Sequence, residues 1–245
     1  MLASGIMFHT VYDGILDLLF PRNCLVCRQW HPSTAELVLC PQCLERIPVN
    51  APPFCSHCSR QLPARTDDGL CTDCRTNPPA FDQAWVAARY EGLLVELIRQ
   101  HKFGGKTALR RTFAHILLAF LRRYNITLAA DMIVPVPLSS VRLRERGYNQ
   151  SLFLAQTLAR YSGIPVRTDI LERPSSSLRQ SGLGRKERFT NMRDAFRINP
   201  SVTIQKRTII LVDDLLTTGA TASQAAQTLK EHGAAAVTLL ALAAA

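Results

Sequence analysis

One segment near the carboxyl end limits what this chain can fold into. Residues 208–212 form an apolar, β-branched run without polar alternation, which predicts a buried strand. Two carboxylates, Asp213 and Asp214, stand at the end of that run, followed by hydroxyl residues, one glycine and a helix-forming stretch over 222–232. A strand, a loop and a helix in this order are typical of an α/β fold whose ligands lie beyond the carboxyl ends of the strands.

The loop after the two carboxylates has the features of a sugar-phosphate site. The N–H groups and partial positive charge at the start of a helix attract phosphate, and glycine lets the backbone approach the anion. Adjacent carboxylates accept hydrogen bonds from vicinal ribose hydroxyls, directly or through Mg²⁺. An ordinary strand end with a helix cap is the alternative. The predicted phosphate-binding residues are Thr217, Thr218, Gly219, Ala220 and Thr221.

The sequence Asp-Asp-Leu-Leu-Thr-Thr-Gly-Ala-Thr is similar to the signature with which type I phosphoribosyltransferases bind phosphoribosyl pyrophosphate (PRPP). The resemblance implies that Asp213 and Asp214, the predicted catalytic residues, hold the ribose hydroxyls, and that the Thr/Gly loop holds the 5′-phosphate. Enzymes of this family that act on 6-oxopurines carry an acidic residue at the position of Thr217. Its absence here argues against that base specificity.

All eight cysteines fall into four Cys-x-x-Cys pairs, and the second two pairs repeat the first two at a constant offset of 31 residues. A gap of two residues lets both thiolates reach one tetrahedral Zn²⁺, and two such pairs complete a site with four cysteine ligands. Spacing alone leaves interleaved ligation open. The offset favours one structural zinc on Cys24, Cys27, Cys40 and Cys43 and another on Cys55, Cys58, Cys71 and Cys74.

Disulfides are the alternative use of these cysteines. The first residues lack the basic start of a secretory signal, and Asp13 and Asp17 interrupt the apolar run that follows. No segment has the length and lack of charge of a transmembrane span. We therefore expect a cytoplasmic protein whose thiolates bind metal. Residues 1–22 are expected to contain an amphipathic helix that docks on the protein, with a peripheral membrane anchor as the alternative.

Beyond the cysteines, predicted strands alternate with predicted helices, which indicates a mostly parallel sheet with helices on both faces. Residues 173–191 are rich in Ser, Arg and Gly and predict a long loop. We expect the loops that start at Pro137, Arg173 and Asp213 to surround one crevice. Strands are expected at 83–90, 131–136, 165–171, 195–198, 208–212 and 236–242, and helices at 93–103, 106–124, 149–161 and 222–232.

A second anion-binding segment is predicted between residues 137 and 149. Arg142, Arg144 and Arg146 alternate along the chain, and in an extended segment they offer bidentate donors to phosphate oxygens. Gly147 and the start of the next helix offer a further cradle for an anion. The alternative is a solvated basic rim.

The charge of the chain points to anionic partners. The formal net charge is +10, and residues 142–207 contribute +9 of it, from fourteen Lys or Arg against five Asp or Glu. Nucleic acid, a pyrophosphate substrate and an acidic membrane surface all fit this balance. Hydrophobic residues make up 47% of the chain, which is enough for a packed core and argues against wholesale disorder.

Taken together, these features resemble the ComF/GntX family, which combines a type I phosphoribosyltransferase-like domain with an amino-terminal cysteine zinc module and is tied to DNA uptake and use. The likeness rests on the cysteine pairs and on residues 102–105, 134–137, 142–151, 188–193 and 213–221. It implies a duplicated four-cysteine zinc module, similar to a double zinc ribbon, at 23–79, a phosphoribosyltransferase-like domain at 80–245 and a pyrophosphate loop at 142–147. It also implies a lid at 173–191 that places Arg179, Gln180, Arg185, Lys186 and Arg188 on the pyrophosphate.

The resemblance implies binding of PRPP with Mg²⁺ and leaves two classes of function open. The first is a Mg²⁺-dependent transferase that moves the phosphoribosyl group to an acceptor, although no acceptor motif is evident. The second is an accessory protein that keeps the fold and binds single-stranded DNA together with other DNA-uptake proteins. A regulator that senses PRPP without turnover lies between the two.

Overall fold

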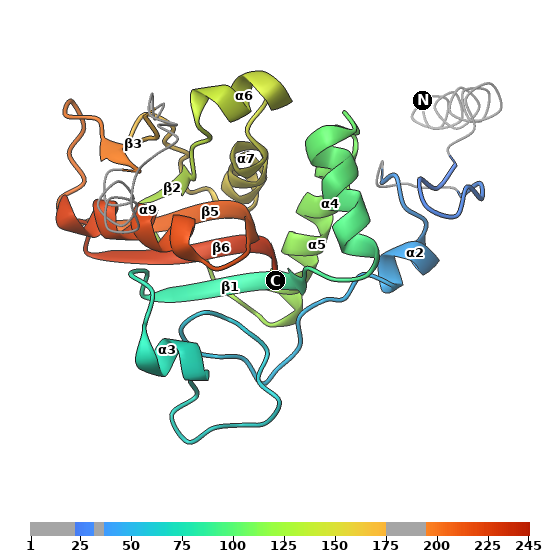
Figure 1. The fold of residues 1–245 in the computed structure, drawn as a ribbon, viewed down its shortest axis with the longest axis horizontal. Coiled ribbons are helices and arrows are strands. Elements are labelled where there is room, and N and C mark those ends of the chain that lie inside the picture. The colour runs from blue at the N-terminus through green and yellow to red at the C-terminus, as the bar shows by residue number, and fades with distance from the viewer. Residues whose placement is uncertain (1–22, 32–36, 175–194) are drawn as a thin grey trace, which may run out of the picture.

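A four-stranded parallel sheet with helices on both faces forms the centre of the protein (Figure 1). The computed structural model describes residues 23–31, 37–174 and 195–245. The strand order is β1-β6-β5-β2, and every neighbouring pair runs parallel. The two central strands, β5 and β6, are buried along most of their length because both faces are covered. The strands are β1 (Gln83–Arg89), β2 (Met132–Pro135), β5 (Thr208–Leu216) and β6 (Ala236–Ala244).

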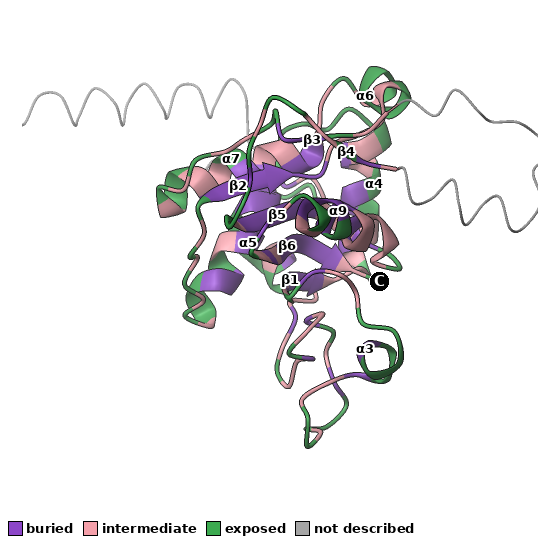
Figure 2. Cartoon of the chain, turned by 90° about the vertical axis from the view of Figure 1, so that its left-hand side faces the viewer, coloured by how far each residue is buried: buried purple, intermediate pink, exposed green. Residues whose placement is uncertain are grey.

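The two faces of the sheet bury separate hydrophobic clusters. On one face, α4, α5 and α7 pack against Ile133, Ile210 and Leu240. On the other face, α9 and the antiparallel pair β3 and β4 pack against Leu211 and Leu239. Figure 2 shows the buried residues concentrated between these layers, which confirms the expected α/β arrangement. The bounds are α4 (Leu93–Phe103), α5 (Leu109–Arg123), α7 (Gln150–Ser162), α9 (Ala220–Glu231), β3 (Leu171–Glu172) and β4 (Arg197–Ile198).

Two elements differ from the sequence prediction. β5 continues to Leu216 because its last residues pair with β6, so Asp213 and Asp214 lie within the strand and not in the loop after it. The strand predicted at 165–171 is reduced to a single bridge between Ile133 and Val166, followed by the two-residue β3. The predicted amphipathic helix at 1–22 lies outside the described residues. Within the described segments, no helix has the length and hydropathy needed to cross a membrane.

The two halves of the cysteine module lie in different surroundings. The first half, with α2 (Pro41–Glu45), packs into the helical layer, since Cys24, Leu39 and Ile47 share one buried cluster with α4 and α5. The second half, with α3 (Thr72–Thr76), forms a small cluster of its own around Leu62 and lies beside β1 (Figure 1).

Hydrogen bonds from the cysteine module cover β1, the strand at the edge of the sheet. Ala84 N donates to the carbonyl of His57 at 2.7 Å, and Val86 N donates to the Ser59 hydroxyl at 3.1 Å. The buried Asn50 side chain donates through Nδ2 to the carbonyls of Ser59 at 2.8 Å and of Val86 at 3.3 Å, which joins the two parts. An uncovered edge strand pairs readily with other chains, and the cysteine module occupies the positions where such pairing would start.

We expect Asn50→Ala to lower the free energy of unfolding by about 1–3 kcal/mol, because it leaves two buried carbonyl groups without the amide donor. Chemical denaturation monitored by circular dichroism measures this change. The matched control is Asn77→Ala, since Asn77 is exposed and its substitution should stay within about 0.5 kcal/mol of the parent. Equal stability of both variants would show that the Asn50 contacts do not hold the module to the sheet.

Candidate functional site

Two adjacent carboxylates near the end of β5 are tied to helices from other parts of the chain. Asp213 is only 9% exposed, and its Oδ1 accepts hydrogen bonds from Ser151 Oγ at 3.1 Å and from the N–H of Asp214 at 2.8 Å. The Oδ2 atom of Asp214 forms an ion pair with Lys102 Nζ at 2.6 Å. The start of α7 and the end of α4 therefore meet at this acid pair.

The environment of the pair controls its charge. Burial, followed by the negative charge of Asp214, raises the pKa of Asp213 to about 7, and the hydrogen bonds from Asp214 N and Ser151 and the charge of Lys102 oppose this rise. Burial therefore favours the protonated form of Asp213. A bound group that offers hydroxyl donors or positive charge would stabilise the ionised form.

Lys102 and Ser151 are contacts that sequence reasoning did not assign to the site. Both stand in segments used for the family resemblance, but their roles depend on contacts between residues far apart in the chain. Ser151 is in the first turn of α7, where Asn149 caps the helix by accepting from Ser151 N at 3.1 Å. For Lys102, the available signal was its place in the sequence, as a basic residue directly before Phe103 and the Gly104-Gly105 pair.

The predicted phosphate loop lies immediately beyond β5. Thr217 and Thr218 are exposed, and Ala220 N donates to Thr218 Oγ1 at 3.3 Å. Gly219 has a φ of 73°, a conformation that glycine adopts without strain, and it starts α9 without a side-chain cap. Thr221 is half-buried in the first turn. The first N–H groups of an α-helix lack intrahelical acceptors, so this end of α9 is open to an anion.

The segment predicted as a basic loop contains a short helix, so the extended conformation in which the alternating arginines would act together is not found. Ser140–Arg146 form the short helix α6, which Ser139 caps by accepting from Arg142 N at 3.4 Å and which Gly147 ends with a φ of 76°. Residues two apart in a helix do not face the same way. Arg142 and Arg144 are exposed, whereas Arg146 is half-buried and donates to Gln150 Oε1 at 3.2 Å.

Electrostatic interactions connect the three loop starts expected around one crevice. Burial, with the positive charge of Arg142, lowers the pKa of the Arg173 guanidinium, and Asp213 opposes this effect. Arg173 also lies over the ring of Phe196 at 5.3 Å. Arg173 is thus a further basic group near the acid pair. The predicted lid residues Arg179, Gln180, Arg185, Lys186 and Arg188 lie outside the described residues.

A hollow of about 600 Å³ separates the predicted phosphate loop from the second half of the cysteine module. One wall contains Thr217, Thr218 and Gly219, and the opposite wall contains Arg60 and Cys74. The guanidinium of Arg60 forms an ion pair with Asp73 at 2.5 Å. The second cysteine cluster therefore faces the loop directly.

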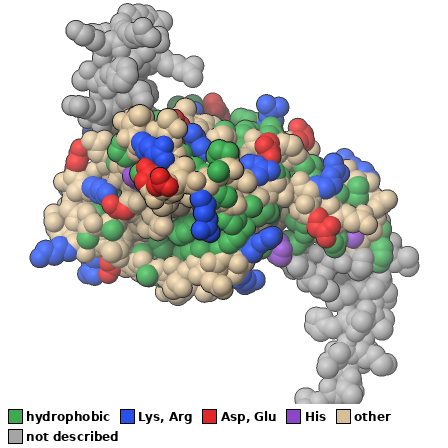
Figure 3. All heavy atoms as spheres, turned by 90° about the horizontal axis from the view of Figure 1, so that it is seen from below, with side chains coloured by type: hydrophobic (Ala, Val, Ile, Leu, Met, Phe, Trp, Pro, Cys, Tyr) green, Lys and Arg blue, Asp and Glu red, His purple; other side chains and the backbone are tan. Residues whose placement is uncertain are grey.

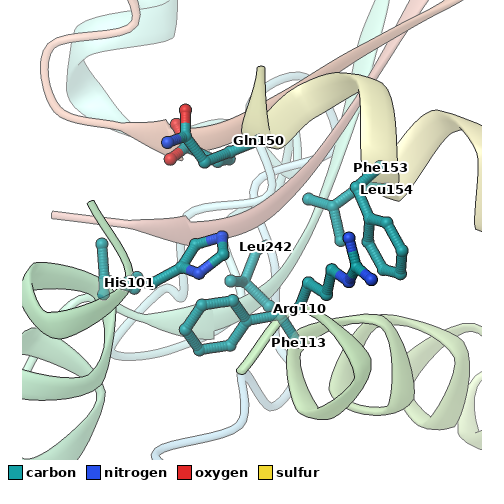
Figure 4. Close-up of a pocket in the computed structure, with 9 residues that line it drawn as sticks. His101, Arg110, Phe113, Gln150, Phe153, Leu154 and Leu242 are labelled. Atoms are coloured by element: carbon teal, nitrogen blue, oxygen red, sulfur yellow. The ribbon is translucent and has the colours of Figure 1, made fainter. Parts of the chain in front are cut away.

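A narrow slot beside Asp214 is lined by a buried side-chain amide whose nitrogen has no hydrogen-bond partner among the described residues. In Figure 4, His101 lies near the ring of Phe113, and Arg110 lies beside Phe153. Gln150 also lines this slot, is 4% exposed, and its Nε2 has no hydrogen-bond acceptor among the described residues. A buried donor of this kind costs free energy unless a water or ligand satisfies it.

The eight cysteines form two clusters in the sequential pairing favoured by the sequence. In each cluster the four sulfur atoms lie within 4.8 Å of one another. The two clusters repeat the same contacts: Cys40 N donates to Cys24 Sγ at 3.4 Å, and Cys71 N donates to Cys55 Sγ at 3.3 Å. The interleaved alternative is thereby excluded. His57 is not among the four ligands of its cluster.

The geometry and chemistry of both clusters fit structural zinc. Zn–S bonds of about 2.3 Å in a tetrahedron place sulfur atoms about 3.8 Å apart, and the Cys27–Cys40 and Cys58–Cys71 sulfur distances are 3.7 and 3.6 Å. Burial raises the pKa of Cys43 to about 12. Burial also opposes ionisation of Cys24, but backbone N–H groups outweigh it and lower that pKa to about 6. Four thiolates therefore coexist only with a cation among them.

Sequence comparison gives related proteins over most of the chain. A family model described as a double zinc ribbon domain matches residues 15–75. Competence protein F of Haemophilus influenzae is 32% identical over 218 residues, which cover 87% of this chain and 93% of that protein. DNA utilization protein YhgH of Escherichia coli is 31% identical over 217 residues, which cover 87% and 86%.

Structural comparison gives phosphoribosyltransferases as partial matches. A purine phosphoribosyltransferase from Pyrococcus horikoshii covers 54% of this chain and 70% of its own, with 20% identity and a TM-score of 0.33. Glutamine PRPP amidotransferase from B. subtilis covers 58% and 30%, with 18% identity and a TM-score of 0.41. At such scores the likeness supports no conclusion about activity.

Paired substitutions test the zinc sites. With sequential clusters, Cys24→Ser/Cys40→Ser removes two ligands from one site and should leave about one zinc per chain, whereas Cys24→Ser/Cys55→Ser damages both sites and should lose nearly all zinc. Atomic emission of the dialysed proteins measures the content. If the sites were interleaved, Cys24→Ser/Cys40→Ser would lose nearly all zinc and Cys24→Ser/Cys55→Ser would keep about one zinc per chain.

The raised pKa of Asp213 predicts how stability changes with pH. A carboxyl group whose pKa is higher in the folded than in the unfolded state stabilises the fold. This stabilisation is complete at a pH below 3.8, the ordinary pKa of the group, and it is lost as the pH rises to about 7. Asp213→Asn keeps an acceptor for Ser151 but does not ionise. Its unfolding free energy should therefore rise relative to the parent by up to about 1.4 kcal/mol per pH unit across this window. If denaturation curves gave the same difference in unfolding free energy between variant and parent at every pH, the raised pKa of Asp213 would be contradicted.

Proposed function

The chain belongs to the ComF family, with competence protein F and the DNA utilization protein YhgH, and from this membership we propose that it binds PRPP at the carboxyl end of β5. The proposal places the ribose hydroxyls on Asp213 and Asp214 and the 5′-phosphate on residues 217–221. It places the pyrophosphate toward α6. The role in the cell that the relatives' names suggest is DNA uptake or use.

The observation that carries this proposal is the acid pair at the end of β5, followed closely by the open start of α9. Carboxylates suit vicinal hydroxyls, and a helix start suits a phosphate, so the two parts match the two ends of a sugar phosphate. The ion pair between Lys102 and Asp214 and the hydrogen bond from Ser151 hold the acids in fixed positions. A preformed site binds with less loss of conformational freedom.

If the site transfers the phosphoribosyl group, its main task is to stabilise the leaving pyrophosphate. Bond cleavage at the ribose C1 carbon places positive charge on the ribose and negative charge on the pyrophosphate. Arg142 and Arg144 are exposed on α6, and Arg173 adds a half-buried charge. Fixed positive groups near the leaving oxygens lower the barrier without having to reorganise.

The carboxylates present suit a magnesium ion that arrives with PRPP. Asp213 and Asp214 provide the hard oxygen donors that Mg²⁺ prefers. The ion supplies positive charge that offsets the pyrophosphate. Lys102 already neutralises one of the two acids, so this lysine sets how much negative charge remains for a metal. No acceptor for the sugar is assigned by these residues.

The alternative function is an accessory protein that binds single-stranded DNA without transfer, or a regulator that senses PRPP. The relatives' names and the net charge of +10 favour a link to nucleic acid. However, Figure 3 shows acidic side chains interspersed with Lys and Arg on the face seen from below, where the charge forms no continuous basic stripe. We therefore rank the sugar-phosphate site first because of the acid pair near the end of β5 and the start of α9.

The decisive experiment is calorimetric titration of PRPP with Mg²⁺ into the zinc-loaded protein. We expect saturable binding by the parent and at least a tenfold loss in Asp213→Asn/Asp214→Asn, because about 1.4 kcal/mol of lost hydrogen bonding corresponds to that factor. The matched control is Asp67→Asn/Asp68→Asn, an adjacent acid pair in the second half of the cysteine module, which should bind as the parent does. A folded parent that fails to bind PRPP would leave the DNA-binding accessory function as the better proposal.

A further inference from the structure

The hollow between the predicted phosphate loop and the second half of the cysteine module is larger than one phosphate group requires. Its volume is about 600 Å³, within the range of about 300–1,000 Å³ that is common for small-molecule sites. Residues 216–220 form one side of it, but neither Asp213 nor Asp214 is among the described residues that line it. The hollow is therefore a space separate from the acid pair that borders the same loop.

The charges that line the hollow cancel. Arg60 and Asp73 are the charged side chains among its described lining residues, and they form an ion pair with each other at 2.5 Å. Cys58 and Cys74 also line it, and a zinc ion held by four thiolates carries a net negative charge. This balance does not attract a phosphate, so the group that fits the hollow itself is uncharged.

The walls of the hollow offer both hydrogen-bond donors and acceptors. Gln224 on α9 and Asn77 on the opposite side have amide side chains without a hydrogen-bond partner among the described residues. An amide donates and accepts at once, as the edge of a nucleobase does, and such pairs form two hydrogen bonds together. Apolar contacts for a flat ring come from Pro79, Phe81 and Leu216. An uncharged polar ring with apolar faces, such as a nucleoside, matches this lining.

We propose that the hollow holds the second nucleoside of a dinucleotide whose linking phosphate lies at the predicted phosphate loop. The ribose of the first nucleotide would lie on the acid pair, and its 5′-phosphate would carry the nucleoside that enters the hollow. The inference rests on the proposed function, because the ligand shares the ribose and phosphate positions of PRPP. It goes beyond that function, because the 5′-phosphate of PRPP carries no further group and leaves the hollow unfilled.

Two sources share this chemistry, and paired probes separate them. In a small molecule such as ADP-ribose, the extension is joined through a pyrophosphate. At the 3′ end of a ribonucleotide strand, the last ribose keeps both hydroxyls and its 5′-phosphate is joined to the preceding nucleoside. Calorimetry with the zinc-loaded protein therefore compares ribose 5-phosphate with ADP-ribose, and uridine 5′-monophosphate with the dinucleotide UpU. Within each pair the first ribose and its phosphate are the same.

The variants are Gln224→Ala, Gln224→Trp and the matched control Gln156→Trp. Gln224 is half-buried on the face of α9 that lines the hollow, whereas Gln156 is an exposed residue of α7 outside it. We expect the extension to strengthen binding to the parent about tenfold in at least one pair. Gln224→Trp should remove this gain by filling the hollow, and Gln224→Ala should reduce it. Both should bind ribose 5-phosphate as the parent does, which shows that they are folded, and Gln156→Trp should keep the gain.

The outcomes separate this inference from the proposed function. A gain with ADP-ribose alone supports a pyrophosphate-linked small molecule, and a gain with UpU supports the end of a strand. If the parent binds PRPP but neither extension strengthens binding, or if the gain survives in Gln224→Trp, the inference is overturned and the PRPP site stands. A parent that binds neither PRPP nor ribose 5-phosphate overturns the proposed function and the inference with it.

Discussion

The arrangement of the site depends on the cost of placing two carboxylates near the end of a buried strand. Asp213 is almost fully enclosed, and the charge of Asp214 is next to it. Charged groups in such positions require compensating partners. The protein supplies them from two helices, with Lys102 from α4 and Ser151 from α7. The contacts that offset the cost of burying the acid pair also fix the ends of these helices around it.

The contacts of the acid pair also place the residues around it. Once Lys102 is held by Asp214, Phe103 has to follow at the end of α4, and Tyr148 fastens that end from the segment before α7. Arg146 reaches both Phe103 and Gln150 because α6 ends at the neighbouring Gly147. A buried ion pair is weak evidence for stability, but breaking it by removing one partner would leave an uncompensated charge in this position.

Much of the fold follows from local sequence patterns, whereas the contacts at the site do not. The helix predicted at 93–103 and the strand predicted at 83–90 are found with almost the same bounds, because each has a consistent apolar period. The short helix α6 was not predicted, because Val141 and Leu143 alternate with arginines in a period of two, which is not the period of a helix. The pairing of Lys102 with Asp214 depends on how the sheet brings distant segments together, which no local pattern encodes.

The two cysteine clusters show how one sequence repeat acquires two structural roles. Their internal hydrogen bonds are the same, but the first cluster is buried in the helical core and the second borders the hollow beside the predicted phosphate loop. Zinc bound at the first cluster would therefore chiefly stabilise packing of the helical layer. Zinc bound at the second would hold the segment with Ser59, which bonds to the edge strand β1, and Arg60, which lines the hollow together with Thr217 and Thr218. The second cluster therefore borders the predicted phosphate loop, whereas the first packs against α4, whose Lys102 forms the ion pair with Asp214.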